Sequence, residues 1–457
     1  MTSPGHDSAT DSRPPGGPTY TSFNQRTRIE QYRRPTPVRK PPVTFGLRIS
    51  GAFDVGALQA ALNVIGRRHD GLRQFFPAGT DSCFAACVSR TEFEWPLQVL
   101  NLAEGGDSRC AEDLLSAELG KPFDLDAPPL VRAVVCQLPN RCLVGFSADH
   151  VVFDGQSVSV FLDELSTAYR YHLVHRSPGV SERTADWGQA AFALEEDRFL
   201  RTSRAEESLQ FWEGRWRASD HLVASPSRGS GTSEATAAEM KHSAVSHSAD
   251  EVAAAMSRHR DHVATPFMLI TAALVSALQE RGDACAPDLL ITVSGRSTAA
   301  ANRAIGYFIN RILFSLPVSP GPGFGEVIKQ TQAELFAVLK NSKIPYQYLA
   351  ERIVSHRVDD ILGTRSILLT QYRHQRAPVI PGVEVEFFWI DTDADPSHND
   401  RLALELVEDA PGGGFELVST YNASVYEPAM IEDLMAHISE RIVPEKSRIL
   451  GRAEGGQ

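Results

Sequence analysis

Apolar residues recur with helical spacing in three segments of the chain. In residues 54–65 they follow Asp54 at positions i, i+3, i+4 and i+7, which predicts a helix that Asp54 caps. Residues 157–169 carry a second apolar stripe, and Ser157 precedes it as a candidate cap. Residues 265–282 form a third candidate, because a Thr-Pro pair opens the segment and a glycine closes it.

Short apolar runs bounded by polar residues alternate with these helices and predict β-strands. They occupy residues 141–148, 288–295, 311–318 and 415–423. Strands mixed with helices along the whole chain favour an α/β or α+β fold over a helical bundle or a sandwich. No run approaches the roughly 18 uninterrupted apolar residues of a membrane span, so we expect no such span.

Composition narrows the possible partners. The chain has 457 residues, which is room for two or three domains of roughly 100–200 residues each. Its formal charge of −12 argues against binding to nucleic acid and to anionic membrane surfaces. Residues 1–19 are rich in Ser, Pro and Gly and lack a secretory signal, so they predict a flexible tail on a cytoplasmic protein.

Several common sites are missing from the sequence. The six cysteines lack the paired spacing of a zinc site, so we predict no metal. The chain also lacks the glycine-rich loops that bind nucleotides, the HExxH helix of metalloproteases and the GxSxG turn of serine hydrolases. We therefore expect no bound cofactor and a chemistry that rests on side chains alone.

The segment SADHVVFDGQS, residues 147–157, carries the most chemical information. It places His150, Asp154 and Gly155 between a predicted strand and a predicted helix, where a rigid element ends and exposes its polar side chains. Imidazole, with an ordinary pKa of about 6.5, suits proton transfer near neutral pH. We expect Gly155 to permit a tight turn that a Cβ would obstruct. A structural interpretation also fits, with His150 a buried, hydrogen-bonded histidine and Asp154 an acid at the helix start.

Residues 149–155, DHVVFDG, resemble the HHxxxDG motif of condensation domains. These are the amide- and ester-forming domains of nonribosomal peptide synthesis, within the chloramphenicol acetyltransferase-like superfamily. His150, Asp154 and Gly155 match the second His, the Asp and the Gly, and Asp149 stands where the first His is usual. Further landmarks occur in the expected order: SFNQ at 22–25, RRHDGLRQFF at 67–76, KPFDLDAPPLVRA at 121–133, ITVSGRS at 291–297, IGYFINRILFSLPV at 305–318 and IPYQYL at 344–349.

The resemblance implies an α/β fold with two chloramphenicol-acetyltransferase-like lobes, each with a mixed sheet and flanking helices. The lobes are expected to form a V with a central tunnel, in which a donor and an acceptor meet at the histidine motif. After the tail 1–19, residues 20–180 would form the N-terminal lobe, which carries DHVVFDG, and residues 181–450 the C-terminal lobe. The turn-rich segment 175–186 agrees with a connector at this boundary.

The same resemblance implies roles for the motif residues. His150 would be the catalytic residue, taking a proton from an attacking amine or hydroxyl, or positioning that group. Asp154 would be structural and would pair with Arg296 of the SGRS segment. Neighbouring side chains of an extended segment point to opposite faces, so Asp149 would point away from the tunnel and accept backbone hydrogen bonds. The alternatives are that the Asp149 carboxylate tunes His150 or the substrate, or that the site is catalytically weakened.

Three further residues are candidates to line the tunnel. Gly306 and Asn310 belong to the GxFxN element of the family, although core packing and a turn would explain them equally. Gln371 stands where the family often has an Asn.

The function implied is that of a stand-alone condensation enzyme. It would transfer an acyl group from a phosphopantetheine thioester on an acyl or peptidyl carrier protein to the amine or hydroxyl of a small-molecule or carrier-tethered acceptor. One alternative is an O- or N-acyltransferase of the superfamily with a CoA thioester donor, and another is a catalytically silent recruitment module. The basic stretch 26–40 is a candidate docking surface for a carrier protein, which is often acidic.

Overall fold

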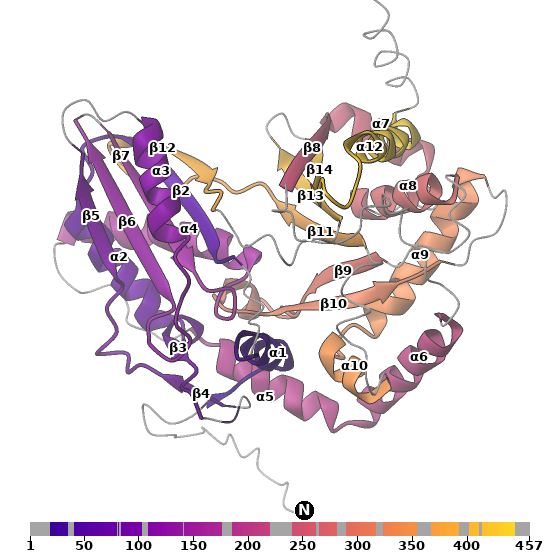
Figure 1. Ribbon diagram of the computed structural model, residues 1–457, viewed down its shortest axis with the longest axis horizontal. Coiled ribbons are helices and arrows are strands. Elements are labelled where there is room, and N and C mark those ends of the chain that lie inside the picture. The colour runs from indigo at the N-terminus through magenta and orange to yellow at the C-terminus, as the bar shows by residue number, and fades with distance from the viewer. Residues whose placement is uncertain are drawn as a thin grey trace, which may run out of the picture.

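We analysed a computed structural model of the protein. It describes residues 19–34, 41–79, 81, 84–102, 108–139, 141–175, 185–219, 240–261, 265–280, 289–316, 323–353, 367–392, 402–410 and 414–443. Figure 1 shows two lobes that diverge toward one end of the molecule and meet at the other, in the shape of a V. The expected tail 1–19, the connector 175–186 and the basic stretch 26–40 each fall wholly or partly outside the described residues.

The first lobe is built on a mixed five-stranded sheet in the order β12-β2-β7-β6-β5. Its strands are β2 (Val43–Gly51), β5 (Leu97–Asn101), β6 (Val131–Leu138), β7 (Arg141–Ala148) and β12 (Val383–Trp389). Helices α2 (Val55–Arg68) and α4 (Gly155–His175) pack on one face of the sheet, and α3 (Ser108–Leu119) packs on the other. Alternating apolar side chains supply both cores, as expected for a sheet that is covered on its two faces.

The second lobe has a mixed six-stranded sheet in the order β10-β9-β11-β13-β14-β8. Its strands are β8 (Met240–His247), β9 (Leu289–Ser294), β10 (Ile309–Phe314), β11 (Ile367–Arg373), β13 (Ala403–Ala410) and β14 (Gly414–Asn422). One face is covered by α7 (Ala249–Arg258), α8 (Pro266–Glu280), α9 (Phe324–Lys340) and α12 (Pro428–Ile442). Helix α8 has a continuous run of buried residues because it lies at the centre of this layer.

One strand is exchanged between the lobes. Strand β12 follows β11 of the second lobe along the chain, yet it pairs antiparallel with β2 of the first lobe (Figure 1). This pairing gives hydrogen-bond partners to the edge of β2, which would otherwise be exposed. The linear boundary at residue 180 does not anticipate this exchange, because it assigns residues 383–389 to the second lobe.

Short elements join the lobes at the closed end of the V. They are α1 (Phe23–Tyr32), α5 (Gln189–Leu200), α10 (Tyr346–Ile353), the 3₁₀ helices Gly71–Arg73 and Ala301–Arg303, and a small sheet of β1 (Thr19–Tyr20), β3 (Gln74–Phe75) and β4 (Phe84–Cys87). Helix α6 (Ser203–Ser219) follows α5 and packs into the core of the second lobe. Helix α1 begins with a capping box formed by Ser22 and Gln25, the two fixed positions of the SFNQ landmark.

The structure confirms several of the expected elements and corrects two of them. The caps Asp54 and Thr265 and the strand 141–148 are confirmed, since Asp54 accepts from Ala57 N and Thr265 from Met268 N. Ser157 does not cap α4, because the helix begins at Gly155 and it is Asp154 that accepts from the Ser157 amide. The strand expected at 311–318 begins two residues earlier, because β10 pairs with β9 from Ile309 onward.

Candidate active site

His150 lies in a short loop between the central strand β7 and helix α4. Strand β7 is paired on both sides, with β2 and β6, so the loop starts from a rigid element. His150 is half-buried, and its ring meets the ring of Tyr307 edge-on, with centroids 5.6 Å apart and planes at 77°. Tyr307 belongs to the segment before β10, so the histidine faces the junction of the two lobes.

Asp149 holds this loop in place through hydrogen bonds to the backbone. Its side chain is 4% exposed, and Oδ1 accepts a hydrogen bond of 2.8 Å from the Val151 amide. The Asp149 amide donates to Leu130 O, and Gln25 Nε2 donates to Val151 O at 3.0 Å. The Asp149 carboxylate therefore takes a backbone hydrogen bond, as a structural role requires, and the first landmark of the chain supports the same loop.

Asp154 and Arg296 form a bidentate ion pair with both side chains wholly buried, so the expected pairing is present. Arg296 donates from Nη1 to Asp154 Oδ2 at 2.7 Å and from Nη2 to Oδ1 at 2.9 Å. The amide of Phe308 also donates to Oδ2 at 3.1 Å. Burial disfavours the charged carboxylate, but Arg296 and the hydrogen bonds outweigh it and hold the pKa of Asp154 below its ordinary value. Stability from this pair is present above the ordinary carboxyl pKa and is lost as pH falls through the lowered value.

Ser157 extends this ion pair into a connection between the lobes. Its hydroxyl lies 2.8 Å from Asp154 Oδ1 and accepts from Gly306 N at 3.1 Å and Arg296 Nη2 at 3.0 Å. A Cβ at Gly306 would come within 2.5 Å of the Phe308 ring, so the backbone approaches closely only because this residue is glycine. Gly306 thus packs at the junction, which the packing interpretation of the sequence expected.

Gly155 does not have the role expected from the sequence. It is the first residue of α4, and a Cβ built there would meet nothing within 4 Å. Its φ is not among the positive values found in the described residues. The backbone of this turn therefore does not require glycine, and the missing side chain simply leaves open space at the start of α4.

Two residues that the sequence did not single out also hold the site together. His69 is fully buried, accepts from the Ile305 amide at Nδ1 and lies 3.1 Å from Glu164 through Nε2, so it connects α2 and α4 to the second lobe. Gln189 accepts from the Tyr307 amide at 2.7 Å and thereby fixes the residue that contacts His150. The landmark RRHDGLRQFF contains His69, but its partners lie too far along the chain to be found from spacing.

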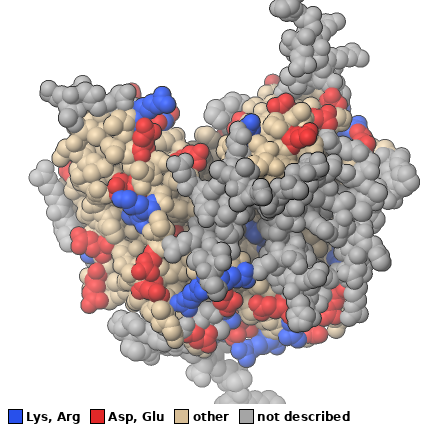
Figure 2. Space-filling model, in the orientation of Figure 1, with Lys and Arg blue, Asp and Glu red and all other residues tan. Residues whose placement is uncertain are grey.

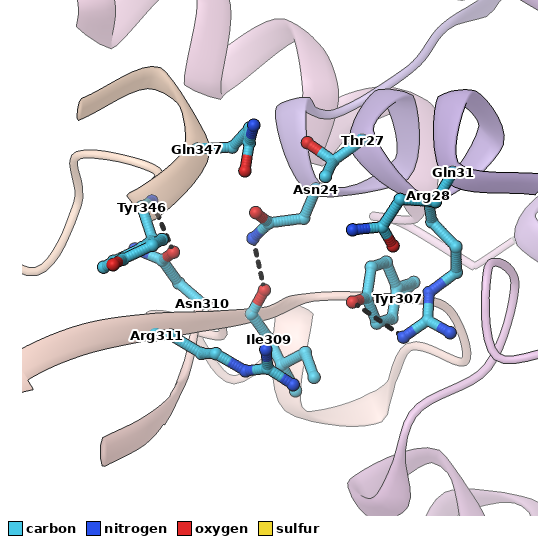
Figure 3. A pocket seen from close by; sticks show the side chains of 10 residues that line it. All are labelled: Asn24, Thr27, Arg28, Gln31, Tyr307, Ile309, Asn310, Arg311, Tyr346 and Gln347. Carbon is cyan, nitrogen blue, oxygen red and sulfur yellow. Dashed lines mark hydrogen bonds between the residues drawn. The ribbon is translucent and has the colours of Figure 1, made fainter. Parts of the chain in front are cut away.

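Asn310 has a structural position beside a small cavity. Its Nδ2 donates to Ser342 O and Ile344 O, at 2.8 and 2.7 Å, and its Oδ1 accepts from Tyr346 N at 2.9 Å. The cavity has a volume of about 70 Å³ and lies between α1, β10 and α10 (Figure 3). Its lining includes Asn310, but neither Gly306 nor Gln371, which is exposed on β11. The tunnel itself stays a prediction.

The described residues contain no group of three or more His, Cys, Asp or Glu side chains that could hold a metal ion. In the same residues, no helix is long and apolar enough to cross a membrane. The site therefore consists of an imidazole at the lobe junction, a buried ion pair behind it and a hydrogen-bonded loop that holds both.

Comparison with known sequences identifies the family. The condensation-domain family matches residues 42–443. One linear gramicidin synthase polypeptide of Brevibacillus parabrevis is 25% identical over 402 residues, which are 86% of this chain and 8% of that polypeptide. Phosphinothricin tripeptide synthetase PhsC of Streptomyces viridochromogenes is 25% identical over 359 residues, 78% of this chain and 33% of that protein. The chain thus spans a small part of the length of the curated relatives that it matches.

Solved structures show the same fold. The X-domain from teicoplanin biosynthesis has a TM-score of 0.76 at 19% identity and covers 94% of both chains. The condensation domain of the monacolin K polyketide synthase MokA has a TM-score of 0.76 at 18% identity, over 94% of this chain and 98% of that one. VibH, a condensation enzyme, has a TM-score of 0.70 at 15% identity, over 95% and 97%. Together with the family match, this fold shows that the chain belongs to the condensation-domain family.

Proposed function

We propose that this condensation domain transfers an acyl group from a phosphopantetheine thioester on a carrier protein to an amine or hydroxyl acceptor. The observation that carries the proposal is the position of His150, on a braced loop at the junction of the lobes. The family match and its relatives among peptide synthetases support the same reaction class.

The reaction needs positioning and proton handling rather than a metal. The nucleophilic nitrogen or oxygen attacks the thioester carbonyl carbon, the carbon–sulfur bond breaks, and an amide or ester forms. The proton lost by the nucleophile passes by way of His150 to the departing thiolate, which leaves as a free thiol. A thiol with an ordinary pKa of about 8.5 is a good leaving group, and general-base help contributes typically about 10²- to 10⁴-fold.

Basic side chains near α1 support docking of an acidic carrier protein. Figure 2 shows Lys and Arg side chains at the lower middle of this face, in the region where α1 lies in Figure 1. Arg33 and Arg34 at the end of α1 are exposed. Acidic side chains lie among them in Figure 2, and Arg33 lies 3.8 Å from Asp126. Exposed arginines on a chain of net charge −12 would nevertheless attract an acidic partner to this side. CoA thioesters are the alternative donors.

A recruitment role is the second candidate function. One solved relative in fold is a complex of an X-domain and OxyB from teicoplanin biosynthesis, with a TM-score of 0.76. Asp149 at the first position of the motif is the feature of this chain that favours such a role. In that case the fold would present a surface to a partner and His150 would carry no chemistry.

The test is a transfer assay read by mass spectrometry, with acyl-carrier and acyl-CoA donors and a panel of amine and alcohol acceptors. We expect product from carrier-bound donors, and a loss of about 10²- to 10⁴-fold in rate for His150→Ala. His175→Ala, at the exposed end of α4, is the matched control. Equal transfer rates for His150→Ala and the wild type would exclude the catalytic role of His150, whereas no product from any donor would favour recruitment.

A further inference from the structure

The cavity beside Asn310 has an unusual lining. Figure 3 shows it between α1 and β10, and its ten lining residues include two arginines and no Asp or Glu. One face of α1 supplies four of the ten, Asn24, Thr27, Arg28 and Gln31, at helical spacing. Arg311 approaches from β10. Both cations therefore adjoin a space whose lining includes no acidic side chain.

Arg28 is buried without a full set of partners. It is 4% exposed; Nη2 donates to Tyr307 Oη at 3.3 Å, and Nη1 has no hydrogen-bond partner among the described residues. Its guanidinium also lies over the Tyr307 ring, 5.1 Å from the centroid. A buried cation with an unsatisfied donor costs free energy unless an anion accompanies it.

Arg311 adds a second positive charge to the same place. Burial lowers the pKa of Arg311, and the charge on Arg28 acts in the same direction, so the two guanidinium groups repel each other. Among the described residues, no ion pair joins either arginine to a carboxylate. Burial lowers the pKa of Arg28, but Tyr307, Tyr32 and the charge of Asp149 outweigh burial and raise this pKa overall. Asp149 acts on Arg28 only through its charge, and its Oδ1 already accepts from Val151.

The position of the cavity limits what the anion could be. Tyr307 contacts both Arg28 and His150, so a single side chain separates the cavity from the imidazole. The phosphate of a phosphopantetheine arm lies at the opposite end from the thioester sulfur, which must reach His150. A compact anion close to the reacting carbon fits better, and paired guanidinium groups favour a carboxylate.

We propose that Arg28 and Arg311 bind a carboxylate carried by one of the two substrates. The inference rests on the proposed function, because it takes His150 as the place where donor and acceptor meet. The carboxylate could belong to a free amino or hydroxy acid acceptor or to a dicarboxylic acyl donor. Either source would place the rest of its molecule beside Tyr307 and toward His150.

The first test measures binding without turnover. Thermal unfolding of the full chain is followed in sodium acetate and in inorganic phosphate, each against sodium chloride at equal ionic strength. We expect acetate to raise the midpoint for the wild type and for Arg26→Met, a control on α1 that does not line the cavity. The rise should disappear in Arg28→Met and in Arg311→Met. Equal rises in all four proteins, no rise with acetate, or a rise with phosphate alone would overturn the proposal.

The second test measures selectivity. Acceptors and donors are compared as matched pairs, a free carboxylate against its amide, in the transfer assay. We expect a KM about 10- to 100-fold lower for the carboxylate form of one partner, and loss of this preference in Arg28→Met with a smaller change in kcat. The partner that shows the preference identifies the source.

The two proposals can fail separately. Equal use of acid and amide would exclude the carboxylate site and leave the proposed function intact. Arginine-dependent protection by acetate without any transfer would exclude the proposed reaction and support the binding site. Arg28→Lys and Arg311→Lys keep the charge, so they provide folded comparisons if a Met variant does not fold.

Discussion

Two buried arginines at the lobe junction are surrounded very differently. Arg296 forms two charge-assisted hydrogen bonds with Asp154 and lies over the Phe308 ring at 4.5 Å. Arg28 also lies over an aromatic ring, Tyr307, but it lines a cavity and forms no ion pair with a carboxylate among the described residues. Each arginine keeps one buried donor without a hydrogen-bond partner there, Nη1 of Arg28 and Nε of Arg296, so the difference lies in the ion pair. The same side chain therefore stabilises the fold in one place and remains available in the other.

The difference has a physical basis. A buried ion pair with good geometry is costly to break, because removal of one partner leaves an isolated charge. A buried cation without an anion gains nothing comparable from the folded state. Loss of Arg296 should therefore reduce stability, whereas loss of Arg28 should reduce binding.

Loss of the Asp154–Arg296 pair should lower stability most. Arg296→Met should destabilise the protein by about 3–5 kcal/mol, because Asp154 then stays buried without its cation. Urea unfolding measures this change. Arg204→Met, which removes an exposed pair with Glu207, should change stability little. A small effect of Arg296→Met in the same assay would contradict the structural role of the pair.

A smaller effect is expected at the hydroxyl that extends the pair. Ser157→Ala should cost about 1–3 kcal/mol, because Gly306 N and Arg296 Nη2 lose an acceptor in a buried place. Thr167→Ala, on the exposed side of the same helix, is the control. Equal stabilities for the two variants would show that Ser157 is not needed to join the lobes.

Glu196 is a buried acidic side chain, opposite in charge to the two buried arginines. It accepts from the Phe23 amide at 2.7 Å, and burial raises its pKa to about 7. Between pH 4.5, the ordinary pKa, and about pH 7, the folded state therefore keeps a proton on Glu196 that the unfolded state has lost. The free energy of unfolding falls as pH rises through this window.

Glu196→Gln removes this charge and should stabilise the protein by about 1–2 kcal/mol at pH 8 and hardly at all near pH 4. Unfolding midpoints across this pH range measure the difference. Glu206→Gln, exposed on α6, is the control. A gain at pH 4 as large as at pH 8 would show that ionisation of Glu196 is not the cause.

Replacement of either arginine beside the cavity should change stability least. Arg28→Met and Arg311→Met should each leave stability within about 1 kcal/mol of the wild type, or raise it, because an apolar side chain replaces an unpaired cation. Urea unfolding measures the change in the free energy of unfolding for each variant. A loss as large as that of Arg296→Met would mean that these arginines serve the fold.

From the sequence, only those residues of the site could be found that lie close together along the chain. His150, Asp154 and Gly155 lie in one short segment between a strand and a helix, so their proximity follows from the chain itself. The Asp154–Arg296 pair came from family resemblance, because its members lie far apart in sequence. The expected role of Gly155 was wrong, because a turn pattern does not reveal whether a Cβ would meet an obstacle.

The sequence alone determined the alternation of helices and strands, the histidine loop and the family resemblance, because each depends on residues close together along the chain. Tertiary structure decided the rest. It placed β12 beside β2, His69 beside Ile305 and Tyr307 against His150. It also placed Arg28 and Arg311 around one cavity without an acid in its lining. These outcomes depend on how distant segments pack, and no spacing within a segment records that packing.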